Sequence, residues 1–130
     1  MKIALQYNEI NELIKRETGY EIIVKHVSSD TLHVSYNISI PFIGKKEIGV
    51  DVQILGFKNS SLELKAATDL ISKILSLIPS LDISKYATID NEIISVQLNN
   101  IDELKKALSV VHPTNLCSSN EYLMLEGTLL

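Results

Sequence analysis

Alternating apolar and polar residues at positions 31–55 form the clearest pattern in the chain. In 31–40 the apolar side chains occupy even positions and the polar ones odd positions, and 47–55 repeats this order as far as Ile54. A third run at 61–65 places Leu62 and Leu64 on one side and Glu63 and Lys65 on the other. A period of two is typical of strands with one buried face.

The shared parity of these runs also predicts how the strands pair. Facing residues of an antiparallel pair lie on the same side of the sheet, so partners across the turn between 40 and 47 must sum to an even number. A shift by one residue would turn Ile38 or Val50 into water. The pattern therefore predicts an antiparallel meander with one covered face and one solvated face.

Segments with helical spacing are expected to cover the apolar face of this sheet. A helix at 8–18 ends before Gly19, and a helix at 101–111 begins after Asn100 and ends before Pro113. A further helix at 67–78 ends before Pro79, and its apolar stripe consists of Leu70, Ile71, Ile74, Leu75 and Ile78.

Shorter signals complete the predicted fold. Strand-like sequence occupies 20–27, a hairpin is expected over 86–98 around Asp90 and Asn91, and 122–126 can add a closing strand. We predict one α+β domain over residues 1–130. It has two layers, a bent antiparallel sheet and the two or three helices packed against it.

Composition narrows the possible functions. A chain of 130 residues with 45% hydrophobic residues can bury a core without disulfides or metal. Its net charge is −4, it has no Trp, and its longest basic run is Lys45-Lys46, so nucleic-acid binding is not expected.

The hydropathy of the chain bears on where it resides. No segment approaches the roughly 20 apolar residues of a membrane span, so no transmembrane segment is expected. The first residues lack the apolar stretch of a signal peptide. We expect a cytoplasmic protein as the sequence stands, or an exported one if a signal peptide has been removed.

Candidate chemistry is sparse. The histidines at 26, 33 and 112 do not have zinc-site spacing, and a single cysteine excludes an internal disulfide. Cys117 and His112 could be imagined as a nucleophile and its activator, but nothing places the thiol beside a fixed cation or at a helix N-terminus. The glycines form no phosphate-binding loop. We predict no catalytic, cofactor-binding or metal-ligating residue, and favour a protein that is not an enzyme.

The carboxylates at 47, 51 and 63 share the solvated face of the predicted sheet. Paired carboxylates act in acid–base catalysis when burial separates their pKa values, and an exposed face does not provide that burial. We expect cross-strand pairing with Lys65 instead.

The predicted turn at 41–46 has an unusual composition, since Phe42 and Ile43 stand beside Lys45 and Lys46. Such a tip could enter a membrane interface or a groove on a partner. The favoured alternative is that Phe42 or Ile43 folds back over the open end of the core.

The inward side chains are mostly aliphatic, with few aromatic residues. A concave sheet of this kind, covered by a helix, can hold an acyl chain, with Tyr36 as a polar contact. The same residues also describe a dry, close-packed core. The candidate ligand-lining residues are Leu32, Val34, Tyr36, Ile38, Val50, Val52, Ile54, Leu70, Ile71 and Ile74.

The order of these elements resembles the bacterial members of the tubular lipid-binding superfamily. The resemblance covers most of the chain and is one of pattern. It implies that a helix and a curled sheet enclose an apolar tube, and it assigns no functional residue beyond the apolar lining. The resemblance is seen most clearly where the proline-containing segment Leu77-Ile78-Pro79-Ser80-Leu81 leads into the hairpin at 87–96.

Two functional hypotheses follow. The first is a non-enzymatic binding module for a lipid or another apolar ligand. The alternative is a subunit for protein–protein interaction or assembly, such as a homodimer, with a dry core and with its apolar face or edge strand completed by a partner.

Overall fold

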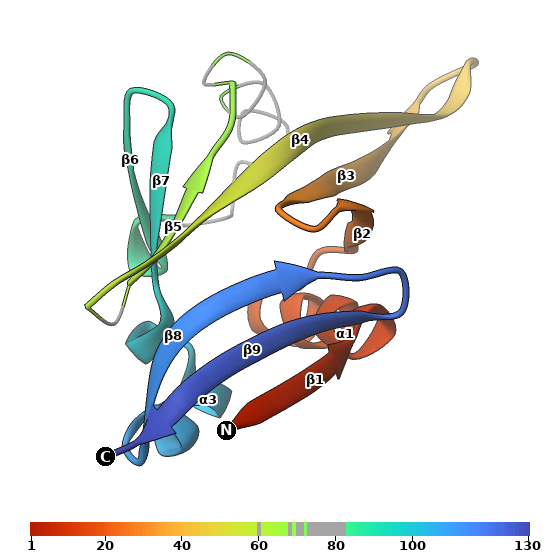
Figure 1. The fold of residues 1–130 in the computed structure, drawn as a ribbon. Coiled ribbons are helices and arrows are strands. Elements are labelled where there is room, and N and C mark those ends of the chain that lie inside the picture. The colour runs from red at the N-terminus through yellow and green to blue at the C-terminus, as the bar shows by residue number, and fades with distance from the viewer. Residues whose placement is uncertain (60, 68, 70–71, 73–82) are drawn as a thin grey trace.

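The computed structural model describes residues 1–59, 61–67, 69, 72 and 83–130. Within these residues the strands form two antiparallel sheets, of six strands in the order β2-β3-β4-β5-β7-β6 and three in the order β1-β9-β8 (Figure 1). The strands of the larger sheet are β2 (Ile22–Ser28), β3 (Thr31–Ile40), β4 (Gly44–Lys58), β5 (Ser61–Lys65), β6 (Ala87–Asp90) and β7 (Ile93–Gln97). Those of the smaller sheet are β1 (Lys2–Gln6), β8 (Val111–Ser118) and β9 (Tyr122–Leu129).

The helical elements are short. Within the described residues they are the α-helices α1 (Tyr7–Thr18) and α3 (Asp102–Leu108) and the 3-10 turns η1 (Ile83–Lys85) and η2 (Leu98–Asn100). The helix expected at 67–78, with Leu70, Ile71 and Ile74, lies almost entirely outside the described residues. Among the residues that are described, no helix has the length and apolar character needed to cross a membrane.

The predicted fold class, a two-layer α+β domain, is wrong. Strands account for 59% of the structure and helices for 22%, so the fold is predominantly β. The prediction assumed that helices alone cover the apolar face of the larger sheet. In the described structure the core on that face is shared with the smaller sheet and with α1.

The predicted antiparallel pairing of the central hairpin, with partners that sum to an even number, is confirmed. Val34 faces Val50, Leu32 faces Val52, and Ile40 faces Gly44 at the turn, so every pair sums to an even number. Along β4 the alternation holds, with the side chains at 50, 52 and 54 buried and those at 51, 53 and 55 exposed. The period of two therefore fixed the inward face of β4 correctly.

Ser35 departs from this pattern, because it is only 4% exposed although it lies on the predicted solvated face. Gly49 lies opposite Ser35 and has no side chain of its own. The ring of His33 occupies that space, since a Cβ at Gly49 would lie 2.4 Å from His33 Nε2 and 3.3 Å from Ser35 Cβ. The absence of a side chain at Gly49 thus lets the His33 ring fold over the sheet beside Ser35.

The chain from α3 onward also differs from the prediction. The helix expected at 101–111 ends at Leu108, and residues 111–118 form β8 instead of a loop. Pro113 lies inside this strand, opposite Gly127. A proline lacks the N–H that a central strand must donate, but β8 is an edge strand among the described strands, next to β9, and can accommodate it.

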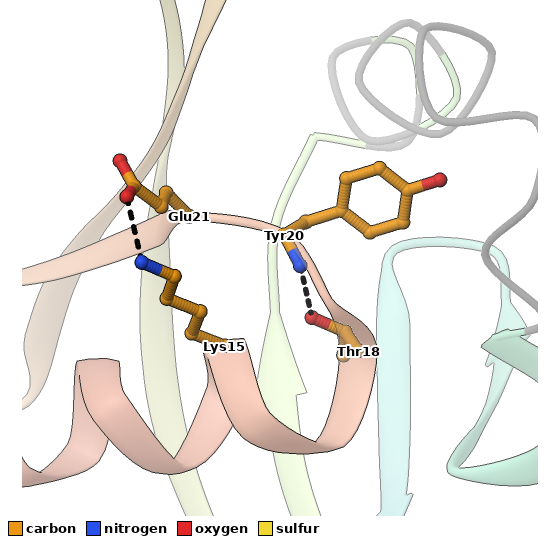
Figure 2. A network of polar contacts seen from close by, with 4 residues as sticks. All are labelled: Lys15, Thr18, Tyr20 and Glu21. Atoms are coloured by element: carbon orange, nitrogen blue, oxygen red, sulfur yellow. Dashed lines mark hydrogen bonds and ion pairs between the residues drawn. The ribbon is translucent and has the colours of Figure 1, made fainter.

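The end of α1 is fixed by local contacts. Gly19 adopts a φ of 79°, and its N–H donates to the carbonyl of Lys15 at 2.7 Å, which confirms the predicted end of the helix. Lys15 Nζ lies 2.9 Å from Glu21 Oε1, and Tyr20 N–H donates to Thr18 Oγ1 at 3.2 Å (Figure 2). These contacts hold the link through which α1 enters β2.

Candidate functional site

The apolar core lies between the two sheets and against α1. Its buried residues come from both sheets, and Ile10 and Ile14 of α1 pack against them. Strand β8 passes close to β2, where Ser118 N–H donates to the carbonyl of Ser29 at 2.9 Å. The buried members of this cluster are Val24, Leu32, Ile54, Leu116 and Leu123.

This space contains a pocket of about 440 Å³. One side is formed by the larger sheet, through Ile22, Val24, Leu32, Val34, Ser35, Tyr36, Val50, Val52, Phe57, Leu62, Leu64, Ile94 and Val96. The rest comes from the smaller sheet, α1 and the η2–α3 segment, through Leu5, Ile10, Leu13, Ile14, Leu98, Ile101, Leu104, Leu116, Leu123 and Leu125.

The surface that these residues present to the pocket is apolar throughout. Ser35 and Tyr36 belong to the lining but expose only carbon atoms to it. The ring of Tyr36 also meets the ring of Tyr20 edge-on, with 6.1 Å between centroids. Tyr36 is therefore not the polar contact that the sequence analysis expected.

The candidate ligand-lining residues fall into three groups. Five of them lie in the lining, namely Leu32, Val34, Tyr36, Val50 and Val52. Two described residues lie outside it, since Ile54 belongs to the buried core cluster and Ile38 is a partly buried residue nearer the β3–β4 turn. Leu70, Ile71 and Ile74 lie outside the described residues.

Sequence reasoning missed how many elements contribute to this pocket. Residues of β5 and β7 were assigned to strands, and those of α1 to a helix, without being placed around one space. Leu5 and Leu116 were missed altogether because β1 and β8 were not predicted. A weak signal existed at the N-terminus, where Ile3 and Leu5 alternate with Lys2, Ala4 and Gln6.

A polar network joins α1, β2 and β8. Ser118 Oγ lies 2.6 Å from both Tyr7 Oη and His26 Nδ1, and Tyr7 also donates to the carbonyl of Ser119 at 2.8 Å. Although a serine beside a histidine suggests a nucleophile, Ser118 is 5% exposed and its hydroxyl is engaged on both sides. We interpret this network as a structural link between the sheets.

A second polar cluster lies on the outer face of the larger sheet. His33 Nδ1 lies 2.8 Å from Asp51 Oδ1, and His33 Nε2 lies 3.5 Å from Glu47 Oε1. Glu47 and Asp51 thus pair with His33, whereas Lys65, the partner expected from sequence, faces Gln53. Side chains this exposed form surface pairs of small energetic weight.

No metal or thiol site emerges from the described residues. They contain no group of three or more His, Cys, Asp or Glu residues that could hold a metal ion. His112 and Cys117 both lie on β8, five positions apart, and a strand rise of about 3.3 Å per residue separates them by roughly 16 Å. Their side chains do not form the pair that was considered from sequence.

Comparison with known proteins adds no relative to this picture. No family model matches the chain, and no significant match was found among curated proteins or solved structures. The resemblance to tubular lipid-binding proteins stays a prediction from the sequence pattern. The pocket and the surface of the molecule are therefore the features that bear on function.

Proposed function

We propose that the protein is a non-enzymatic binding module whose pocket takes up a lipid acyl chain or a similar apolar ligand. The observation that supports this is the apolar pocket between the two sheets, with a volume of about 440 Å³. Ligand sites in proteins typically measure about 300–1,000 Å³ and are lined mainly by apolar side chains.

The size of the pocket argues against ordinary packing imperfection. Protein interiors are packed to crystal-like density, and few voids exceed the size of one water molecule. A water molecule occupies roughly 30 Å³ of the liquid, so the pocket corresponds to the volume of more than ten. Water in this space would find no hydrogen-bond partner on the pocket walls. An apolar ligand is therefore a better occupant than solvent.

The chemistry of the lining restricts the ligand class. No described lining residue exposes a polar atom to the pocket, so none can hydrogen-bond to a buried polar group of the ligand. Burying such a group without a partner costs free energy. The portion inside the pocket should therefore be a hydrocarbon chain or ring, with any headgroup kept outside.

A neutral fluorescent probe provides the direct test. N-phenyl-1-naphthylamine should bind saturably to the purified protein and be displaced by a long-chain fatty acid. Val52 is 5% exposed and lies in the lining, so Val52→Trp should reduce probe affinity more than it reduces stability. Native mass spectrometry of the untreated protein should detect a co-purified acyl species.

The matched control places the same indole outside the pocket. Val110 is 55% exposed and not part of the lining, so Val110→Trp should leave probe affinity unchanged. If the wild-type titration is flat and no acyl species co-purifies, the proposal is wrong. Val52→Trp would then simply be overpacked, at a cost of about 1–3 kcal/mol.

An assembly subunit is the second candidate, favoured by the edges of the larger sheet. Among the described strands, β2 and β6 each have a neighbour on one side only. An edge strand can pair with a strand of a second chain. A stable homodimer in native mass spectrometry, together with a flat probe titration, would place this candidate first.

A further inference from the structure

The turn between β3 and β4 presents two large apolar side chains to solvent. Phe42 has a relative exposure of 109% and Ile43 of 78%, so neither folds back over the core as the sequence analysis favoured. The turn is closed by a hydrogen bond from Ile43 N–H to the carbonyl of Ile40 at 3.2 Å. Figure 1 shows this turn, in yellow, at the far end of the β3–β4 ribbon.

The backbone of this tip is held in an unfavourable conformation. Phe42 has a φ of 68°, in the left-handed region that bulky residues avoid, and Gly44 has a φ of 103°. Burial often offsets the cost of such a conformation, but Phe42 has no such compensation within the described chain. Insertion of the Phe42 side chain into an external apolar environment would offset the cost of this backbone conformation.

The charges behind the tip are positive. Lys45 and Lys46 are exposed, and residues 37–46 contain no Asp or Glu, although the whole chain carries a net charge of −4. Glu21 is close enough for Lys45 to contribute to the lowering of its pKa, but Lys15 is the larger cause. Glu21 pairs with Lys15 at 2.9 Å (Figure 2). Glu47, which follows Lys46, lies 3.5 Å from His33 Nε2, and both lysine side chains are exposed.

We propose that this tip docks the protein onto a membrane surface that contains anionic lipids. Phe42 and Ile43 enter the boundary between headgroups and acyl chains, and Lys45 and Lys46 contact the lipid phosphates. The lysines follow Ile43 by two and three residues, or roughly 7–10 Å along a strand. Apolar groups at interfaces are buried to a depth of about 5–10 Å, so the spacing matches.

The sequence offers a specific spectroscopic test, because the chain contains no Trp. In Phe42→Trp the only indole should shift its emission to the blue when vesicles of phosphatidylglycerol and phosphatidylcholine are added. The matched control is Val110→Trp, at an exposed apolar position between α3 and β8. Its emission should not shift.

Vesicle sedimentation measures the binding itself. The double substitution Phe42→Ser and Ile43→Ser should weaken binding at least tenfold, whereas Val110→Ser should not. Replacing either lysine with Gln should weaken binding to anionic vesicles roughly fivefold, since one basic residue near such a surface contributes about that factor. Added salt should have the same effect. Thermal melts of the variants should match the wild type because these side chains are exposed.

Several results would overturn the proposal. These are the absence of vesicle binding, binding that survives the double serine substitution, or a Phe42→Trp emission that does not shift. If the double substitution instead converts a dimer to a monomer without affecting vesicles, the tip is a contact between two copies of the chain. Docking goes beyond the proposed ligand binding, because the tip substitutions should leave affinity for the neutral probe unchanged.

Discussion

Ser118→Ala tests the interpretation of the Tyr7–Ser118–His26 network as a link between the sheets. The proton count of the network fixes its direction. The carbonyl of Ser119 can only accept, so Tyr7 uses its single proton there at 2.8 Å. Ser118 must then donate to Tyr7, and His26 Nδ1 must carry a proton that it donates to Ser118. If Tyr7 instead donated to Ser118, no proton would remain between the Tyr7 hydroxyl and the Ser119 carbonyl.

The expected loss of stability follows from the hydrogen bonds that Ser118 makes. Ser118→Ala removes two hydrogen bonds, each with a net value of about 0.5–1.5 kcal/mol, and leaves the His26 Nδ1–H without its partner. Tyr7 keeps its acceptor at Ser119, so its hydroxyl stays satisfied. We expect the free energy of unfolding to fall by about 1–3 kcal/mol. For a chain of this size that lowers Tm by roughly 4–12 °C.

Chemical denaturation of a double-mutant cycle with Tyr7→Phe measures the effect. Both substitutions remove the same Ser118–Tyr7 bond, so the double variant should lose less than the sum of the single losses. Ser39→Ala, at an exposed position of β3, serves as the control and should change stability by less than about 0.5 kcal/mol. Strictly additive losses would refute the Ser118–Tyr7 bond, and a nitrogen NMR spectrum with His26 protonated only on Nε2 would refute the proton order.

Three further predictions concern the larger sheet. Val50→Asp should lower the free energy of unfolding by more than about 3 kcal/mol because it buries an unpaired charge. Asp51→Val should change the free energy of unfolding by no more than about 1 kcal/mol. Coincident thermal melts of the two variants would contradict this. Gly49→Ala should destabilise the wild type more than it destabilises a His33→Ala variant, since the imidazole occupies the space of the new methyl group. Equal effects in both backgrounds would contradict this. Hydrogen bonds from Ser28, Thr31 and Gln53 lower the pKa of Asp30, so its stabilising contribution should be present at neutral pH and be lost as pH falls through the folded-state pKa. Melts on acidification should show this loss in the wild type and not in Asp30→Asn.

The inward face of the β3–β4 hairpin and the even sums of its paired positions were predictable because the period of two carries two independent constraints. It identifies a strand, and its parity identifies the side that faces the core. A shift by one residue would turn either Val34 or Val50 into water, so the pattern excludes every register in which paired positions sum to an odd number. The alternation did not predict the burial of Ser35, because that burial depends on the absence of a side chain at Gly49 on the neighbouring strand.

What covers the apolar face could not be read from the same pattern. Alternation shows which residues turn inward, but it does not show whether a helix or another sheet faces them. The prediction of a helical cover depended on the apolar stripe at 67–78 and overlooked β1 and β8. Strand β1 is only five residues long, and β8 contains Pro113, which was interpreted as the end of a helix. The pocket was underestimated for the same reason, because much of its lining comes from the smaller sheet and α1.

The long β3–β4 hairpin relates the two proposals to each other. Strand β2 pairs with β3 only as far as Tyr36, and β5 pairs with β4 only from Gln53 onward, so the hairpin extends beyond both neighbours. Val52 in the pocket and Ile43 at the tip are nine residues apart, or about 30 Å along a strand.

The apolar face of the hairpin continues across most of this distance. Beyond the pocket it consists of Ile38, Ile40 and Ile48, all partly buried, before Lys46 and Gly44 interrupt it near the turn. A two-stranded ribbon has little stability of its own in water, and alternation alone does not require it to extend this far. An extension that carries one continuous apolar face from the pocket towards an apolar tip is the arrangement expected if docking and ligand uptake are coupled. The same even-numbered residues that form the inward face of the hairpin would then also line the path between the two sites.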